Sequence, residues 1–135
     1  MQIRERGLPS NGRVFSSGTD YDAYLGERGV VSQDGGRAKG IIYGDGSAEV
    51  VIDQSYYRSG GISPDELPAI VLHELTELKS EGPDSHLKAT IGEYGYILDR
   101  FGVDGLRRYH AKLCNLMGGI NDIRNEALRI LIGSR

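Results

Sequence analysis

Glycine divides this chain into two unlike parts. It makes up 20 of the 135 residues, about twice its usual share of roughly 7%, and most of the glycines lie in the first 61 residues. The clusters at 7–12 and 33–36 combine glycine with other turn-forming residues, which is typical of loops. After residue 63, glycine is sparser and apolar residues recur at helical spacing. The pattern predicts an α+β fold with a loop-rich first part, 1–37, and a helical second part, 64–132.

Two short segments rich in Ile and Val predict a β-hairpin between these parts. They cover residues 38–43 and 48–53, and the turn residues 44–47 separate them. We therefore assign residues 38–54 to a small antiparallel hairpin or sheet. In the loop-rich part, only residues 20–25 have a pattern that indicates a helical turn.

A clear helix-start signal opens the second part. Ser63 suits the N-cap position, Pro64 suits the first helical position, and Glu66 completes a capping box. Four helices are expected, over residues 64–80, 85–101, 103–117 and 121–132.

Apolar spacing predicts which faces of the first two helices are buried. In the first helix the expected buried stripe is Leu67, Val71, Leu75 and Leu78. In the second helix it is Leu87, Ile91, Tyr94, Leu98 and Phe101. Beside the second stripe lies a more polar face with His86, Thr90, Glu93 and Ile97. Because the linker between the helices is short, we expect their polar flanks to converge.

Length and charge favour some protein classes and exclude others. A chain of 135 residues corresponds to a single domain, 1–135. Its 16 basic and 19 acidic residues give a formal net charge of −3, and the basic residues are scattered, which argues against nucleic acid as a partner. No apolar run approaches the roughly 18 residues of a membrane span, and the N-terminus lacks the hydrophobic segment of a signal peptide. We expect a cytoplasmic protein with no membrane partner, although export by another route stays open.

The single cysteine, Cys114, has no second cysteine with which to form an intrachain disulfide. Its apolar neighbours Leu113, Leu116 and Met117 predict a buried thiol. No histidine is expected close enough to lower the pKa of this thiol, which argues against a nucleophilic role.

One segment of the first predicted helix has residue types that suggest metal chemistry. His73 and Glu77 are four residues apart, so they project from the same face of a helix and can hold one ion between them. Glu74 points about 100° away from His73. His86 opens the next helix after a short connection, and we take it as the third ligand. Two histidines and a carboxylate predict a zinc site with one open position.

Two other residues compete with His86 for the third ligand position. Glu93 lies about 10 Å further along the second helix, so His86 and Glu93 are not both expected to reach one ion. We expect Glu93 instead to orient a metal-bound histidine by hydrogen bonding. His110, on the third predicted helix, is the remaining alternative.

The strand pair, the loop and the helix with His73-Glu74-Leu75-Thr76-Glu77 resemble the middle of small zincin-type metallopeptidases, over about residues 38–98. In the HExxH helix of that family both histidines bind zinc, but Glu77 stands here in place of the second one. The resemblance implies a zincin-like core with His73 and Glu77 as zinc ligands. It also implies Glu74 as general base toward zinc-activated water, and a peptide or protein substrate. Strand 49–53 would border the substrate cleft, with the motif helix packed beneath it.

Two further interpretations stay open. The segment His86-Leu87-Lys88-Ala89 is also similar to small phage and mobile-element proteins that carry a His-Glu helix followed by an Ala-His-type helix. A non-catalytic protein of this type would bind a partner, and its polar flank would be a solvated face or would hold a metal without turnover. A small toxin or effector domain with another hydrolytic chemistry is the second alternative. The substrate and the oligomeric state are not encoded in any pattern of the sequence.

Overall fold

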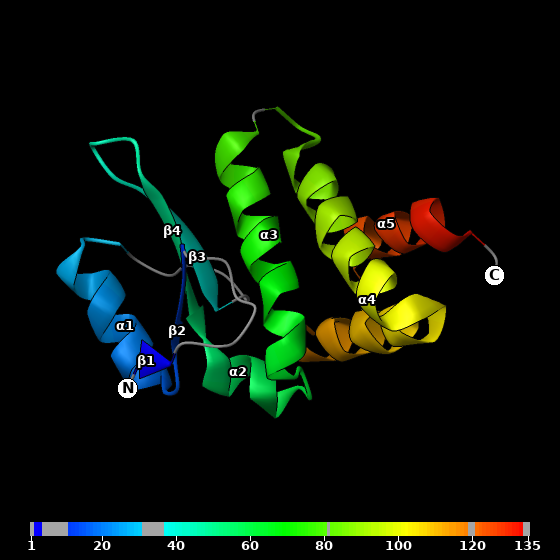
Figure 1. Cartoon of the computed structure of the whole chain (residues 1–135), viewed down its shortest axis with the longest axis horizontal. Coiled ribbons are helices and arrows are strands. Elements are labelled where there is room, and N and C mark those ends of the chain that lie inside the picture. Colours follow the sequence, from blue (N-terminus) through cyan, green and yellow to red (C-terminus); the bar gives the residue numbers. More distant parts are fainter. Residues whose placement is uncertain (1, 4–10, 31–36, 81, 119–120, 134–135) are drawn as a thin grey trace.

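The structure of the chain is a computed structural model, which describes residues 2–3, 11–30, 37–80, 82–118 and 121–133. It shows the expected α+β fold, with a small sheet and a largely helical C-terminal half (Figure 1). The turns predicted at residues 7–10 and 33–36 lie outside the described residues.

The sheet contains four strands. They are β1 (Gln2–Ile3), β2 (Gly12–Phe15), β3 (Ala38–Ile42) and β4 (Ala48–Asp53), in the spatial order β1-β2-β4-β3. β3 and β4 pair in antiparallel fashion, which confirms the predicted hairpin. β2 pairs in parallel with β4, so the sheet is mixed, and the expectation of a purely antiparallel sheet was wrong. The sequence does not reveal β2 because a strand of four residues is too short to show a period.

Five α-helices and one short 3₁₀ helix complete the regular structure of the described residues. They are α1 (Gly18–Glu27), α2 (Gln54–Ser59), the 3₁₀ helix η1 (Pro64–Glu66), α3 (Leu67–Lys79), α4 (Ser85–Leu116) and α5 (Asp122–Ile132). The predicted capping box of Ser63 and Glu66 is present, but the first turn after it is 3₁₀, so α3 begins at Leu67. α1 is longer than the predicted turn, and the short α2 was not predicted. Within the described residues, no helix has both the length and the apolar character that a membrane span requires.

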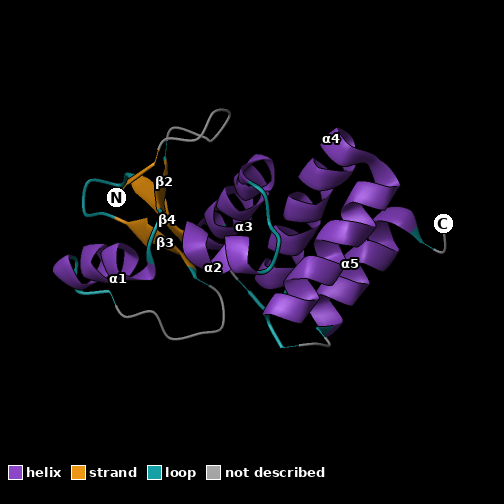
Figure 2. Cartoon of the chain, turned by 90° about the horizontal axis from the view of Figure 1, so that it is seen from below, coloured by secondary structure: helices purple, strands orange, loops and turns teal. Residues whose placement is uncertain are grey.

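Helices cover both faces of the sheet (Figures 1 and 2). Alternate residues of β4 face opposite sides, so that Val51 packs toward α1 while Val50 and Ile52 belong to the larger core on the side of α3. α4 and α5 lie behind α3, away from the sheet. As a result, α3 has one side against the sheet and the other against α4.

A glycine breaks α4 in its middle. Gly102 has a φ of +76° and a ψ of −177°, a conformation that is essentially restricted to glycine, and the two halves of α4 meet there at an angle (Figure 1). The break confirms the boundary predicted between 85–101 and 103–117. In a straight helix, residues 93 and 109 would lie about 24 Å apart. The break instead lets the hydroxyl of Tyr109 donate a hydrogen bond of 2.6 Å to Glu93.

The buried face of α3 only partly follows the predicted stripe. Leu67 and Val71 are buried as expected, whereas Leu75 and Leu78 are only partly buried. Leu78 packs against β3 at Gly40, where an added Cβ would lie 2.7 Å from the Leu78 Cδ1 atom. The helix is also buried beyond the stripe, because it is enclosed from two sides.

In the first half of α4, the predicted buried stripe is only partly confirmed, since Tyr94 is fully buried and three of the other four residues pack against the core. Phe101 is 39% exposed. Leu87, Ile91 and Leu98 are only partly buried. Apart from Tyr94, the fully enclosed residues are Ala89 and three members of the face expected to be polar, namely Thr90, Glu93 and Ile97. Apolar spacing fails here because a buried carboxylate, that of Glu93, occupies the centre of the contact face.

Candidate metal centre

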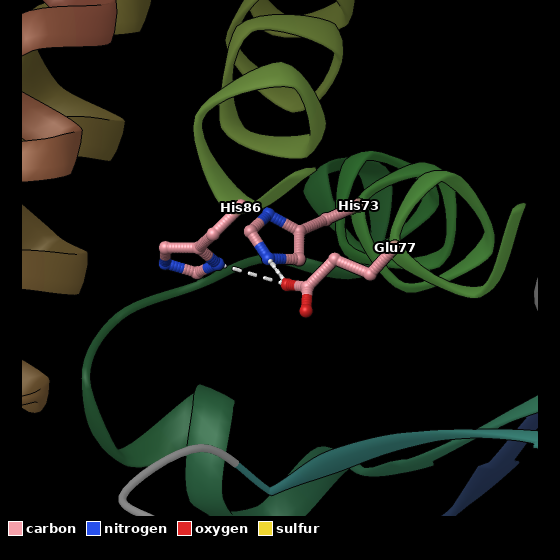
Figure 3. A group of neighbouring side chains, drawn as sticks. All are labelled: His73, Glu77 and His86. Atoms are coloured by element: carbon pink, nitrogen blue, oxygen red, sulfur yellow. Dashed lines mark hydrogen bonds and ion pairs between the residues drawn. The ribbon is translucent and has the colours of Figure 1, made fainter. Parts of the chain in front are cut away.

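Two helices bring His73, Glu77 and His86 together. His73 and Glu77 lie one turn apart on α3, and His86 lies in the first turn of α4, just after the short α3–α4 connection (Figure 3). One ligand atom from each residue lies within 4.8 Å of the other two. Glu77 Oε1 accepts hydrogen bonds from His73 Nε2 and, at 2.9 Å, from His86 Nδ1. The three side chains therefore form a compact group around one carboxylate oxygen.

His73 is held at both ring nitrogens. Its Nδ1 donates to Glu93 Oε1 at 2.7 Å, and its Nε2 faces Glu77. The residue is 5% exposed. Burial alone would lower the pKa of His73, but the hydrogen bonds to Glu77 and Glu93 raise it to about 9. In the absence of metal, His73 is consequently an imidazolium at neutral pH, and its Nε2 proton occupies the place where a cation would bind.

The other two members of the group lie closer to the surface. The side chain of His86 is 41% exposed, and its ring centroid lies 5.0 Å from that of His73. Hydrogen bonds from His73 and His86 hold the pKa of the Glu77 carboxyl well below its usual value. Glu77 is therefore ionised at neutral pH, which is the form that binds a cation.

Glu93 is the innermost residue of the site. Its Oε2 accepts from the Tyr109 hydroxyl at 2.6 Å, and Arg124 Nη1 lies 3.1 Å from each of its oxygens. Burial would raise the pKa of Glu93, but the charge of Arg124 and the hydrogen bond from His73 lower it to about 2. Glu93 contacts the Nδ1 side of His73, so it has the orienting position expected of it and lies outside the three-residue group.

Sequence reasoning did not find Tyr109 and Arg124. Arg124 precedes Leu128 and Leu131 by four and seven residues, which places it on the apolar face of α5. An arginine on the apolar face of a helix indicates that its charge is paired with a buried acidic residue, and this signal was present in the sequence. For Tyr109 there is no comparable signal, because its contact with Glu93 depends on the break at Gly102.

Glu74, the residue expected to act as general base, lies beside the group. Its Oε2 is 3.8 Å from His73 Nε2. Burial raises the pKa of Glu74 to about 7, against the opposing charge of His73. A carboxylate with a pKa near neutrality is suited to accept and return a proton.

His110, the alternative third ligand, is held in a different cluster. Its Nε2 donates to Asn125 Oδ1 at 3.0 Å, and its Nδ1 accepts from the Tyr94 hydroxyl at 2.7 Å.

Cys114 Sγ lies 3.7 Å from His110 Nε2, so the expectation that no histidine lies near this cysteine was wrong. Burial nevertheless raises the pKa of the Cys114 thiol, which disfavours the reactive thiolate.

The group of His73, Glu77 and His86 has the composition of a zinc site. Two imidazoles and one carboxylate are a ligand set of catalytic zinc, in which the ligand atoms lie about 3.3 Å apart. The corresponding atoms here lie within 4.8 Å of one another. No protein-family model, curated protein or solved structure matches this chain. The metal-binding interpretation thus rests on the geometry of these residues.

The strand 49–53, which was expected to border a substrate cleft, is β4. It is an internal strand with β2 and β3 on its two sides, whereas β1 and β3 are the outer strands of the described sheet. β3 also contacts α3, through Gly40 and Leu78. β3 is therefore an outer strand that contacts the helix carrying His73 and Glu77.

Proposed function

We propose that this protein is a zinc-dependent hydrolase, and specifically a metallopeptidase. The observation that carries the proposal is the convergence of His73, Glu77 and His86, with Glu74 Oε2 only 3.8 Å from His73 Nε2. Three protein ligands with a carboxylate beside them are what hydrolytic zinc sites require.

Each residue has a distinct task in this proposal. His73, Glu77 and His86 hold the ion, and bound zinc would supply Lewis acidity toward a carbonyl and toward water. Glu74 accepts the proton of the attacking water and then returns it to the leaving amine. The partly exposed side chains of His86 and Glu77 leave the site open toward solvent.

The choice of a peptide as substrate is supported by the position of β3. An extended peptide can pair with an edge strand through backbone hydrogen bonds alone, whatever its side chains are. β3 (Ala38–Ile42) packs against α3, the helix that carries His73 and Glu74. A peptide paired with β3 would accordingly run past the helix that holds the base.

Zinc content and peptide cleavage should be measured together for Glu74→Gln. Because Glu74 is not a ligand, the variant should keep its zinc while cleavage of a quenched fluorescent peptide library falls by about 10²–10⁴-fold. Glu27→Gln is the matched control, since Glu27 has a 74% exposed side chain on α1. Wild-type protein that binds zinc but cleaves no member of the library would favour the non-catalytic alternative. If the Glu74→Gln variant cleaves peptides as fast as the wild type, Glu74 is not the general base.

A further inference from the structure

A buried ion pair links the candidate metal centre to the C-terminal helix. We propose that Arg124 of α5 is a positioning residue of the metal centre, which acts through Glu93 to fix the orientation of the His73 ring. The inference rests on the proposed metal site and extends it to a helix that contributes no ligand.

The carboxylate of Glu93 is enclosed and fully occupied. Glu93 is 1% exposed, and it receives hydrogen bonds from His73, Tyr109 and Arg124. These donors come from α3, from the second half of α4 and from α5, while Glu93 itself lies in the first half of α4. Its position is consequently defined by three helical segments at once.

Stability alone does not explain why this ion pair is buried. Arg124 is 5% exposed, so both charges have lost their hydration, and such pairs are often replaceable by apolar residues without loss of stability. An apolar residue at position 93 would not offer a hydrogen-bond acceptor to His73. The structural consequence of the Glu93–Arg124 ion pair is therefore that the Glu93 oxygens are held in a defined position relative to His73.

The placement matters because one oxygen of Glu93 serves both His73 and Arg124. Oε1 lies 2.7 Å from His73 Nδ1 and 3.1 Å from Arg124 Nη1. Anchoring of Nδ1 turns Nε2 toward Glu77, on the side where the three ligand atoms converge. Partners that orient a metal-bound histidine in this way contribute to metal affinity although they do not touch the ion.

Arg124 is itself fixed in the first turn of α5. The side chain of Asn121 caps the helix by accepting a hydrogen bond of 3.0 Å from the Arg124 backbone N–H. A continuous chain of contacts thus runs from the start of α5 through the Arg124 guanidinium and Glu93 to His73. The position of α5 is therefore expected to affect the candidate metal centre.

Arg124→Met tests this inference because it removes the guanidinium and keeps most of the side-chain volume. Two quantities should be measured. The first is the zinc Kd, by competition with a chromophoric chelator, which we expect to rise on the order of 10-fold. The second is the low-field NMR signal of the His73 Nδ1–H in metal-free protein, identified by its absence in His73→Gln, which we expect to shift and to exchange faster with solvent. Arg129→Met is the matched control, since Arg129 lies on the exposed side of α5 and pairs with Glu126.

A double-mutant cycle tests the route of the effect. If Arg124 acts only through Glu93, adding Arg124→Met to Glu93→Gln should change the zinc Kd no further. If Arg124→Met does not fold, Arg124→Lys takes its place, because it keeps the positive charge but removes the guanidinium that contacts both oxygens of Glu93.

The outcomes separate this inference from the proposed function. Wild-type protein that binds no zinc would refute the proposed function, and the NMR signal would then decide alone whether Arg124 fixes His73. An unchanged His73 signal in folded Arg124→Met would overturn the inference, even with a weaker zinc Kd, because Arg124 would then act by another route. An unchanged zinc Kd in a protein that does bind zinc would overturn it as well.

Discussion

A buried imidazole needs a partner for each ring nitrogen, and His73 has Glu93 on one side and Glu77 on the other. When no metal is present, His73 holds an additional proton, since both of its partners are ionised carboxylates. A metal ion bound by this group would therefore compete with the proton for the Nε2 atom of His73. The same contacts that prepare the site for a cation also stabilise the metal-free protein.

The pH dependence of stability follows from this proton. The pKa of His73 is raised from 6.5 to about 9, so its contribution to stability is fully present below pH 6.5 and is lost as the pH rises through about 9. In EDTA, the unfolding free energy of the wild type should fall between these pH values by on the order of 1 kcal/mol or more. Urea titrations of wild type and His73→Gln would measure this loss. Equal pH dependence of the two proteins would contradict the assignment of the proton to His73.

Local spacing predicted the three residues that converge and the position of Glu93 behind them, but not the two further partners of Glu93. His73 and Glu77 follow from a separation of four residues, and His86 from the short connection between two helices. Glu93 followed from its position two turns beyond His86. Tyr109 and Arg124 lie 16 and 31 residues from Glu93, and long-range contacts of this kind leave no periodic signal.

At the scale of the element, α4 shows how one buried charge misleads a hydrophobic pattern. The helix turns Glu93 and Ile97 inward because Glu93 has three buried donors. Phe101, an apolar residue, is left partly exposed at the end of the first half. The existence and the approximate ends of the helices after residue 63 were predictable, whereas this rotation of α4 about its axis was not.

Substitutions on the two faces of α4 check the observed rotation. Ile97→Ala removes a side chain with 0% exposure and should destabilise the protein by about 2–5 kcal/mol. Phe101→Ala deletes more atoms but from a position that is 39% exposed, so a clearly smaller loss is expected. Urea unfolding gives both values. A larger loss of unfolding free energy for Phe101→Ala than for Ile97→Ala would indicate that the helix face predicted from the sequence is the buried one.

The break at Gly102 provides the second test at this scale. Its φ of +76° and ψ of −177° are essentially restricted to glycine, so Gly102→Ala should cost about 1–3 kcal/mol. The matched control is Gly95→Ala in the first half of α4, where no atom outside the adjacent residues and the surrounding helix backbone lies within 4 Å of the added Cβ. There the change should be neutral or stabilising, since alanine favours helix. Equal effects of the two substitutions in thermal unfolding would indicate a continuous helix.

At the scale of the whole molecule, the candidate centre lies where the layers of helices meet. α3 lies between the sheet and α4 (Figure 1). Glu93 joins α4 to α5 through its contact with Arg124. The α+β class and the hairpin were predicted correctly. The parallel pairing of β2 with β4 was not, because it joins segments distant in the sequence. A metal bound at this place would stabilise the folded chain as a unit.

Metal analysis of protein purified without a histidine tag is the most direct test of the metal centre. After dialysis against micromolar zinc, the wild type should hold close to one zinc per chain, and His73→Ala should hold none, since two remaining ligands rarely retain zinc. His110→Ala, the same change in a separate cluster, should keep the metal. Wild-type protein that stays metal-free under these conditions, or His73→Ala protein that binds as much zinc as the wild type, would contradict the existence of the site.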